Sequence, residues 1–202
     1  MPDLLVYGDS RSGNCLKVRW TAERLGIPFE WREVSVAAGE TRTPAFFALN
    51  PWGQVPAVRL GDGRVLTQSN AIIAHLAEGS ALTPADAFAR ARVFEWLFWE
   101  QYSHEPAIAV RRYRKVYQNL PDPEIEPALL EKGQRALAHL DDALAGRPYL
   151  VGEALTIADI ALVAYTRWAP EGGFDLTGAR HVLTWIARVE RDLGLPQTQG
   201  AP

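Results

Sequence analysis

Small polar residues cluster where an apolar run near the start of the chain gives way to a helix-like segment. The run is Leu4–Tyr7, and the segment Gly8–Cys15 that follows reads Gly-Asp-Ser-Arg-Ser-Gly-Asn-Cys. The first turn of a helix has unpaired backbone N–H groups and a partial positive charge, so it favours an anion such as a thiolate. We therefore predict an anion-stabilising site here, with Ser12 or Ser10 as the hydroxyl donor.

Two other short motifs carry side-chain amides and hydroxyls. The segment Asn50–Ala57 reads Asn-Pro-Trp-Gly-Gln-Val-Pro-Ala, and Gln68 precedes Ser69 at the start of a predicted helix. In a purely structural interpretation Ser69 is a helix cap, whereas in a functional one the same helix end binds a carboxylate. The residues alone leave both interpretations open.

The elements that position these motifs change in character along the chain. Residues 1–79 alternate β-like runs with helical stretches, in the order βαβ, a helical connection, then ββα. Strands are expected at 4–7, 29–36, 57–60 and 65–66, and helices at 14–25 and 69–77. Asp62-Gly63 supplies the positive φ of a tight hairpin. In the first helix, Lys17 stands among the charged residues that separate the apolar positions.

Residues 80–202 show helical patterns and no convincing strand. Helices are expected at 84–118, 124–145, 156–168 and 180–192. Pro84 suits a first helical position, and Pro106 should kink the long segment because it lacks a backbone donor. Thr156 and Asp159 have the spacing of a capping box and are expected to stabilise the fold. The sequence therefore predicts an α/β domain, 1–79, followed by an all-helical domain, 80–202.

Taken together, the segment after the first strand, the Asn50–Ala57 motif, the Gln68-Ser69 pair and the late capping box resemble those of cytosolic glutathione transferases with a serine-type active site, as found in bacteria. The likeness spans nearly the whole chain. It implies a thioredoxin-like domain that binds glutathione and a helical domain that bears the electrophile pocket. It also implies transfer of alkyl or aryl groups to glutathione as co-substrate, a role in detoxification, and a homodimer.

The resemblance assigns roles to individual residues. Ser12 is the catalytic hydroxyl, and Asn14 matches an asparagine that assists the thiolate. The Val55-Pro56 bond is expected to be cis, which turns the Val55 backbone toward the peptide part of glutathione. The other residues implied in glutathione binding are Gln54, Gln68, Ser69 and Arg42. Because Gln68 stands where the family more often has glutamate, it offers the glutathione ammonium no direct charge pairing.

The stabilisation of the thiolate required of Ser12 corresponds to a definite free energy. A thiol with a pKa near 8.5 is mostly protonated at neutral pH, and only the thiolate is the nucleophile. Lowering that pKa by about two units takes roughly 2.7 kcal/mol of preferential stabilisation. One hydroxyl and a helix end are of the right order to supply it.

The second substrate is expected to contact one face of the long helix. The face carries residues spaced by four, three and four: Tyr102, Pro106, Ala109 and Tyr113. The nearby aromatic group is interpreted as core or subunit interface, and it comprises Phe94, Trp96, Phe98 and Trp99.

Other functions remain open at this point. A glutathione-dependent disulfide reductase or peroxidase would take both thiols from glutathione, because Cys15 is the chain's single cysteine and is expected to be a small buried residue. A non-catalytic binding module of the same fold is a second alternative. The third is an esterase with Ser10 in a Gly-Asp-Ser block, although no Asp-x-x-His pair follows near the C-terminus.

Composition excludes several classes of partner. With a net charge of −3, nucleic acid is not expected as a partner. A basic cluster on the long helix is interpreted as a solvated face, and it comprises Arg111, Arg112, Arg114 and Lys115. No run approaches the roughly 18 apolar residues of a membrane span, and residues 1–7 lack the features of a secretory signal. We expect a cytoplasmic protein that binds neither membranes nor a metal.

Overall fold

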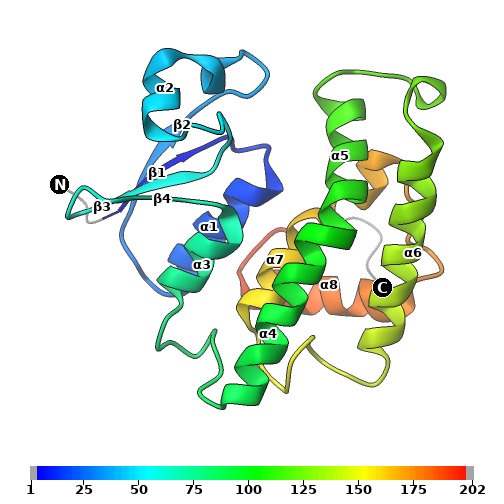
Figure 1. Cartoon of the computed structure of the whole chain (residues 1–202). Coiled ribbons are helices and arrows are strands. Elements are labelled where there is room, and N and C mark those ends of the chain that lie inside the picture. Colours follow the sequence, from blue (N-terminus) through cyan, green and yellow to red (C-terminus); the bar gives the residue numbers. More distant parts are fainter. Residues whose placement is uncertain (1–3, 199–202) are drawn as a thin grey trace. The chain divides into compact units, whose positions relative to one another are not determined.

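The structure, a computed structural model, describes residues 4–198. This part of the chain divides into two compact units, and the boundary along the sequence falls between Ala81 and Leu82. Each unit is described by itself below, and Figure 1 gives the labels of their elements.

The N-terminal unit contains a four-stranded mixed sheet. Its strands are β1 (Leu4–Gly8), β2 (Glu30–Glu33), β3 (Ala57–Leu60) and β4 (Val65–Thr67), in the spatial order β2-β1-β3-β4. β1 runs parallel to β2 and antiparallel to β3, and β4 completes a hairpin with β3. The order βαβ, a helical connection, then ββα agrees with the sequence prediction.

Three helices cover the two faces of this sheet (Figure 1). α1 (Gly13–Arg24) and α3 (Ser69–Leu76) lie side by side on one face, and α2 (Pro44–Leu49) lies on the other. Side chains alternate between the faces of a strand. Accordingly Val6 is fully buried on one face of the sheet. Its neighbour Tyr7, on the other face, packs in a cluster with Phe46 of α2.

β2 is shorter than the predicted strand 29–36. Its ladder ends at Glu33 because its partner β1 ends at Gly8. Beyond that point the Val34 N–H still donates to the Gly8 carbonyl at 2.9 Å. The Val36 N–H then donates to the side chain of Asp9 at 3.0 Å instead of to a strand.

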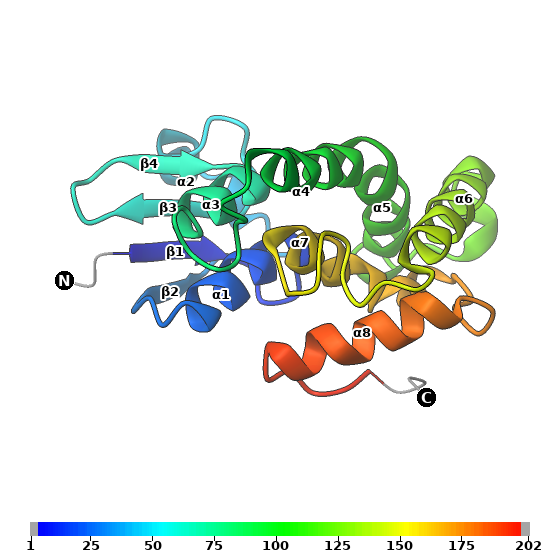
Figure 2. The same ribbon diagram turned by 90° about the horizontal axis from the view of Figure 1, so that it is seen from below.

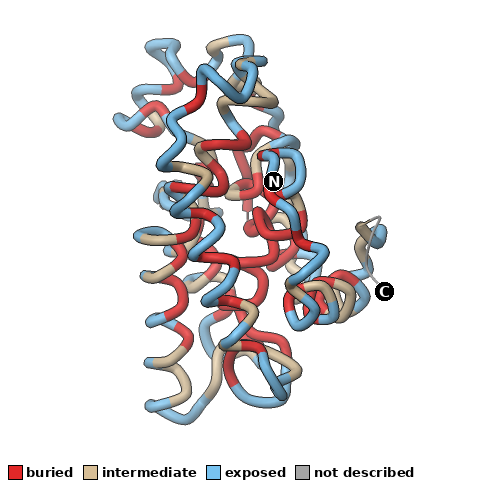
Figure 3. Tube along the Cα trace, turned by 90° about the vertical axis from the view of Figure 1, so that its right-hand side faces the viewer, coloured by how far each residue is buried: buried red, intermediate tan, exposed pale blue. Residues whose placement is uncertain are grey.

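The described part of the C-terminal unit consists of helices and the loops that connect them, with no strand. Its α-helices are α4 (Ala87–Trp99), α5 (Glu105–Val116), α6 (Pro127–Leu144), α7 (Ile157–Thr166) and α8 (Arg180–Asp192). Every residue of α7 is buried, and Figure 2 shows this helix between α4 and α8. The outer helices alternate between buried and exposed residues, as the tube in Figure 3 shows. α7 is therefore the centre of this unit's core.

The long predicted helix 84–118 differs from the structure in two places. Pro84 does not begin it, because α4 starts at Ala87, where the Asp86 side chain caps the Ala89 N–H at 2.8 Å. In place of a simple kink at Pro106, a π-helical turn, Glu100–His104, separates α4 from α5. Proline cannot donate to the preceding turn and its ring crowds that turn, so the wider turn accommodates it.

Asp159 holds the start of α7 through a saturated set of hydrogen bonds. Its carboxylate is fully buried and accepts from the Leu150 N–H, the Thr156 N–H, the Thr156 hydroxyl and the Trp185 indole N–H, each at 2.9 Å. Burial raises the pKa of Asp159, and the four donors oppose that rise. The predicted structural role of Thr156 and Asp159 is confirmed by these contacts.

The prediction of a solvated face for the basic cluster is wrong for two of its members. Arg111 and Arg112 are buried, at 4% and 5% exposure. Arg111 donates to the Gly172 carbonyl at 2.7 Å and to Asp122 at 2.5 Å. Arg112 donates to Glu171 at 2.7 Å. These side chains therefore bind α5 to later segments of the chain. The spacing of charged residues along one helix does not predict such contacts.

Candidate functional site

Gly8 and Asp9 fix the backbone conformation of the loop between β1 and α1. A Cβ on Gly8 would lie 2.5 Å from the Trp31 ring, so only glycine fits at this strand end. Asp9 is buried, and its carboxylate accepts from the Arg11 N–H at 2.8 Å and the Val36 N–H at 3.0 Å. Its backbone carbonyl accepts from the Ser12 N–H at 3.0 Å. The loop therefore delivers Ser12 to the helix end in a defined backbone conformation.

Ser12 occupies the N-cap position of α1, but its side chain makes no capping hydrogen bond. The hydroxyl lies close enough to the Cys15 thiol to oppose the rise in its pKa, and that thiol accepts a hydrogen bond from the Asp9 N–H at 3.3 Å. Burial raises the pKa of Cys15 to about 12. This cysteine is therefore a protonated, enclosed thiol at neutral pH, in agreement with the predicted packing role.

Ser10 contacts Glu33 of β2 and does not contribute its hydroxyl to the start of α1. Its hydroxyl donates to Glu33 at 3.1 Å, and its backbone N–H donates to the same oxygen at 2.8 Å. Burial alone would raise the pKa of Glu33, but the bonds from Ser10 and from the Trp31 indole hold it below its usual range. A serine that donates to a carboxylate without a histidine between them is not arranged as an esterase nucleophile.

The structure brings two predicted site residues, Asn14 and Ser69, into direct contact. The Ser69 hydroxyl donates to the Asn14 side-chain oxygen at 3.1 Å, which joins the first turns of α1 and α3. Lys17, also on α1, places its Nζ 3.5 Å from the Ser69 oxygen and 3.3 Å from the side-chain oxygen of Asn70. Ser69 is the first residue of α3. Its hydroxyl is hydrogen-bonded to α1 and does not cap its own helix.

Gln68, immediately before α3, has a strained backbone. Its φ of 71° and ψ of 112° lie in a region that residues with a Cβ rarely adopt. Such strain persists only where the surrounding structure imposes it, and it gathers at ligand sites. The exposed Gln68 side chain and the start of α3 are therefore held in a fixed relation to each other.

The loop before β3 has an unusual backbone conformation. The Val55-Pro56 peptide bond is cis, as predicted. Within residues 4–198 no hydrogen bond engages the Val55 N–H. The buried Asn50 shapes the loop, because its side chain donates to the Gln54 carbonyl at 2.7 Å and accepts from the Trp52 N–H at 3.1 Å. The Gln54 side chain itself is exposed.

Arg42 lies over the same loop. A Cβ built on Gly53, whose φ is +61°, would be 3.0 Å from a guanidinium nitrogen of Arg42 and 2.8 Å from the Phe47 ring. Glycine is thus required at position 53 both for its conformation and for space. The structure places the Arg42 side chain next to the residue that precedes Gln54, so two predicted glycyl-end contacts are close together.

The four residues predicted to contact the electrophile differ in their surroundings. Tyr102, Pro106 and Tyr113 are exposed, whereas Ala109 is buried at 6% exposure. Tyr102 lies within the π-helical turn, so the regular spacing from which a shared face was predicted is interrupted there. The Tyr113 ring stacks on Tyr117 with centroids 5.2 Å apart.

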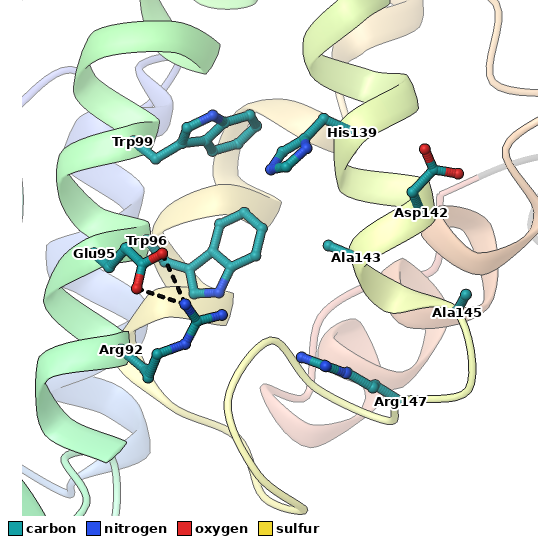
Figure 4. A pocket seen from close by; sticks show the side chains of 9 residues that line it. All are labelled: Arg92, Glu95, Trp96, Trp99, His139, Asp142, Ala143, Ala145 and Arg147. Atoms are coloured by element: carbon teal, nitrogen blue, oxygen red, sulfur yellow. Dashed lines mark hydrogen bonds and ion pairs between the residues drawn. The ribbon is translucent and has the colours of Figure 1, made fainter. Parts of the chain in front are cut away.

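The helical unit also has a hollow between α4 and α6, drawn in Figure 4, with a volume of about 330 Å³. Its aromatic wall consists of Trp96, Trp99 and His139, with ring centroids 5.1 to 5.9 Å apart. Figure 4 shows Arg92 and Arg147 reaching into it from opposite walls. None of the four predicted electrophile contacts lines this hollow.

Comparisons with known proteins agree with this geometry. The sequence profile of the glutathione S-transferase N-terminal domain matches residues 11–78, and that of the C-terminal domain matches residues 112–192. Glutathione S-transferase 3 of Zea mays is 32% identical over 92% of this chain and 88% of its own length. The chain belongs to the glutathione S-transferase family.

Solved structures of that family have the same fold. A glutathione S-transferase from Pseudomonas fluorescens Pf-5 is 46% identical, with a TM-score of 0.89 over 93% of this chain and 94% of that one. A theta class glutathione S-transferase from Xanthomonas axonopodis pv. citri, with glutathione bound, is 31% identical, with a TM-score of 0.86 over 100% and 99%. The predicted fold class, a thioredoxin-like unit followed by a helical one, is confirmed.

Within this glutathione S-transferase family fold, sequence reasoning missed the burial of one residue that contacts Ser69. Lys17 was expected among the polar residues of its helix, yet its side chain is fully buried. The available signal was its position between Leu16 and Val18, both buried, in a helix whose apolar spacing is irregular. A charged residue inside an otherwise apolar stretch is a candidate for a buried polar network.

Among residues 4–198, no helix combines the length and the apolar composition needed to cross a bilayer.

Proposed function

We propose that this protein is a glutathione transferase in which Ser12 stabilises the thiolate of bound glutathione. The observation that carries the proposal is the Ser12 hydroxyl at the N-cap of α1 with no capping bond of its own. A donor in this position adds to the partial positive charge of the helix end. Together they favour the ionised form of a sulfur placed beside them.

The nucleophile of the reaction is the sulfur of glutathione. The chain has one cysteine, and burial raises the pKa of Cys15 to about 12, so it supplies no thiolate at neutral pH. In the proposed step the glutathione thiol releases its proton to solvent. The sulfur then gives an electron pair to an electrophilic carbon, and the bond from that carbon to its leaving group breaks.

Binding of the tripeptide is proposed along the N-terminal unit. The start of α3 at Gln68 and Ser69 is suited to the glutamyl carboxylate, because the backbone N–H groups of a first turn donate hydrogen bonds to an anion. The Val55 backbone, which lacks a hydrogen-bonding partner for its N–H within the described chain, is suited to the cysteinyl peptide group. Gln54 and Arg42 are proposed at the glycyl end, where an arginine pairs with a carboxylate.

Similar proteins support glutathione as the substrate. The structure of the Xanthomonas relative contains bound glutathione, and that protein covers this chain completely. Glutathione is therefore the ligand to test first. The electrophile contacts at Tyr102, Pro106, Ala109 and Tyr113 and the homodimer stay predictions.

The test compares wild type with Ser12→Ala and the matched control Ser10→Ala. Glutathione affinity is measured by calorimetry, and conjugation is followed with an activated aryl chloride. Ser12→Ala is expected to lower kcat/KM about 100-fold, which corresponds to roughly 2.7 kcal/mol. Ser10→Ala is expected to change it less than about twofold, because that hydroxyl is bonded to Glu33.

Three outcomes would contradict the proposal. Loss of activity in Ser10→Ala alone would move the catalytic hydroxyl to Ser10. Glutathione binding without turnover of any electrophile would indicate a binding module. Turnover of disulfides or peroxides in place of the aryl chloride would indicate the reductase or peroxidase alternative.

A further inference from the structure

The hollow between α4 and α6 has the size and lining of a site for a small molecule. Its volume of about 330 Å³ lies within the range of ligand pockets, roughly 300 to 1,000 Å³. Figure 4 shows the rings of Trp99 and His139 at one end, Arg92 and Arg147 at the other, and Trp96 between them. Aromatic faces and guanidinium groups together suit a ligand that has both a flat ring and a negative charge.

A buried donor in this hollow lacks an acceptor. Trp96 is only 6% exposed, and within residues 4–198 its indole nitrogen has no hydrogen-bond partner. An indole N–H can only donate, and a buried donor left unpaired is both unfavourable and uncommon in native proteins. Figure 4 shows this nitrogen on the ring edge nearest the Arg92 guanidinium, which is itself only a donor. An acceptor from a ligand would satisfy the indole N–H.

The charges around the hollow leave one cation without a counter-ion. Arg92 donates to both carboxylate oxygens of Glu95, at 2.7 and 2.6 Å, so its charge is balanced. The Arg147 side chain has no hydrogen bond or ion pair to any residue of the described chain. Asp142 also borders the hollow, but Figure 4 shows its carboxylate turned away from the three rings. The lining therefore suits a ligand with a single negative charge.

The hollow uses one face of α4, and the exposed aromatic residues of this helix use another. Arg92, Trp96 and Trp99 are spaced by four and three, which places them on a common face. Phe94 and Phe98 are four apart on a different face, with their ring centroids 6.4 Å from each other. The prediction of a subunit interface can therefore hold for Phe94 and Phe98 while Trp96 and Trp99 serve a ligand.

We propose that this hollow binds a small aryl carboxylate. The ligand ring lies against Trp96, Trp99 and His139. Its carboxylate accepts from the Trp96 indole N–H and pairs with Arg147. No covalent bond forms or breaks in this step. The inference goes beyond the proposed function and does not depend on it, because every residue proposed to contact glutathione belongs to the N-terminal unit.

The test uses the whole protein and three matched probes. These are 2-naphthoate, its uncharged counterpart 2-naphthamide, and the non-aromatic cyclohexanecarboxylate. Affinity is measured by calorimetry, and the indole N–H signals of the tryptophans are followed by nuclear magnetic resonance, with the Trp96 signal assigned from Trp96→Phe. Wild type is expected to bind 2-naphthoate with a shift of the Trp96 signal, and the other two probes about tenfold more weakly.

Two variants separate the roles of charge and donor. Arg147→Met is expected to weaken 2-naphthoate binding about tenfold and to reduce the preference over 2-naphthamide to about twofold. Trp96→Phe keeps an aromatic ring but removes the N–H, and it is expected to weaken binding about fivefold. The matched control is Arg135→Met, an exposed position of α6 outside the hollow, which should change affinity less than about twofold.

Several results would overturn the inference. Unchanged 2-naphthoate affinity in both Arg147→Met and Trp96→Phe would show that the probe binds elsewhere on the protein. Equal affinity for 2-naphthoate and 2-naphthamide, an unmoved Trp96 signal, or no binding of 2-naphthoate at all would each contradict the proposed site. If Trp96→Phe does not fold, the wild-type Trp96 signal and the exposed Arg147→Met variant decide the question.

Discussion

Each unit of this protein contains a buried polar network at the start of a helix, and the two networks differ in the lengths of their contacts. Around α7, Asp159 accepts four hydrogen bonds at 2.9 Å and has no capacity left. Around α3, Ser69 takes part in longer contacts of 3.1 and 3.5 Å beside the strained Gln68. Short hydrogen bonds around one buried carboxylate stabilise a fold, whereas longer contacts are exchanged more easily for contacts with a ligand.

The largest expected effect comes from removing the centre of the saturated network. Asp159→Ala leaves four buried donors without an acceptor and should lower the free energy of unfolding by about 4 kcal/mol. Urea unfolding followed by circular dichroism measures it. Glu153→Ala, an exposed acid just before α7, is the control and should change stability by less than about 0.5 kcal/mol. A loss below about 1 kcal/mol for Asp159→Ala would contradict the assigned role.

A second buried group of the helical unit should have an intermediate effect. Arg111→Met leaves the Gly172 carbonyl and Asp122 without their guanidinium donor, and we expect a loss of about 2 kcal/mol in unfolding free energy. The exposed Arg135→Met, which removes only an i,i+4 pair with Glu131, should cost about 0.3 kcal/mol. Equal losses of unfolding free energy in the two variants would show that the buried contacts of Arg111 do not add to stability.

A substitution at the start of α3 should change stability in the opposite sense. Gln68→Gly relieves a positive φ and should raise the free energy of unfolding by about 1 kcal/mol while weakening glutathione binding. Asn119→Gly is the control, because Asn119 also has a positive φ of 53° but asparagine tolerates that region. Thermal unfolding and calorimetry measure the two quantities. A destabilised Gln68→Gly would mean that the backbone at position 68 is not strained.

The smallest effect concerns acid pH. The hydrogen bonds to Glu33 outweigh its burial and hold its pKa below the ordinary value of 4.5. A carboxyl with a lowered pKa adds stability above its unfolded pKa and loses that contribution as the pH falls through its folded pKa. Stability should therefore decline below about pH 4.5, and less so in Glu33→Gln. Urea unfolding from pH 6 to pH 3 measures the slope, and identical slopes would contradict the prediction.

The degree to which the site was predictable follows from the type of residue. Ser12 and Ser69 were predicted as site residues because a helix start favours an anion, and Asn14 because of the resemblance to glutathione transferases, while helix capping stayed an alternative use for such residues. Lys17 and Arg111 were not, because both stand in helical stretches where a charge normally faces water. Their burial depends on which element packs against them, and a single helix does not encode that.

The sequence by itself determined the order of the elements, the two-part fold and the positions of the helix ends that present Ser12 and Ser69. These features depend on local periodicity, turn chemistry and caps, all of which act within a few residues. Only the tertiary structure decided that Ser10 is bonded to Glu33, that Asn14 contacts Ser69, and that Lys17 is buried beneath α3. Those contacts join residues that are 23 to 55 positions apart, and hydrogen bonding across such separations depends on packing geometry.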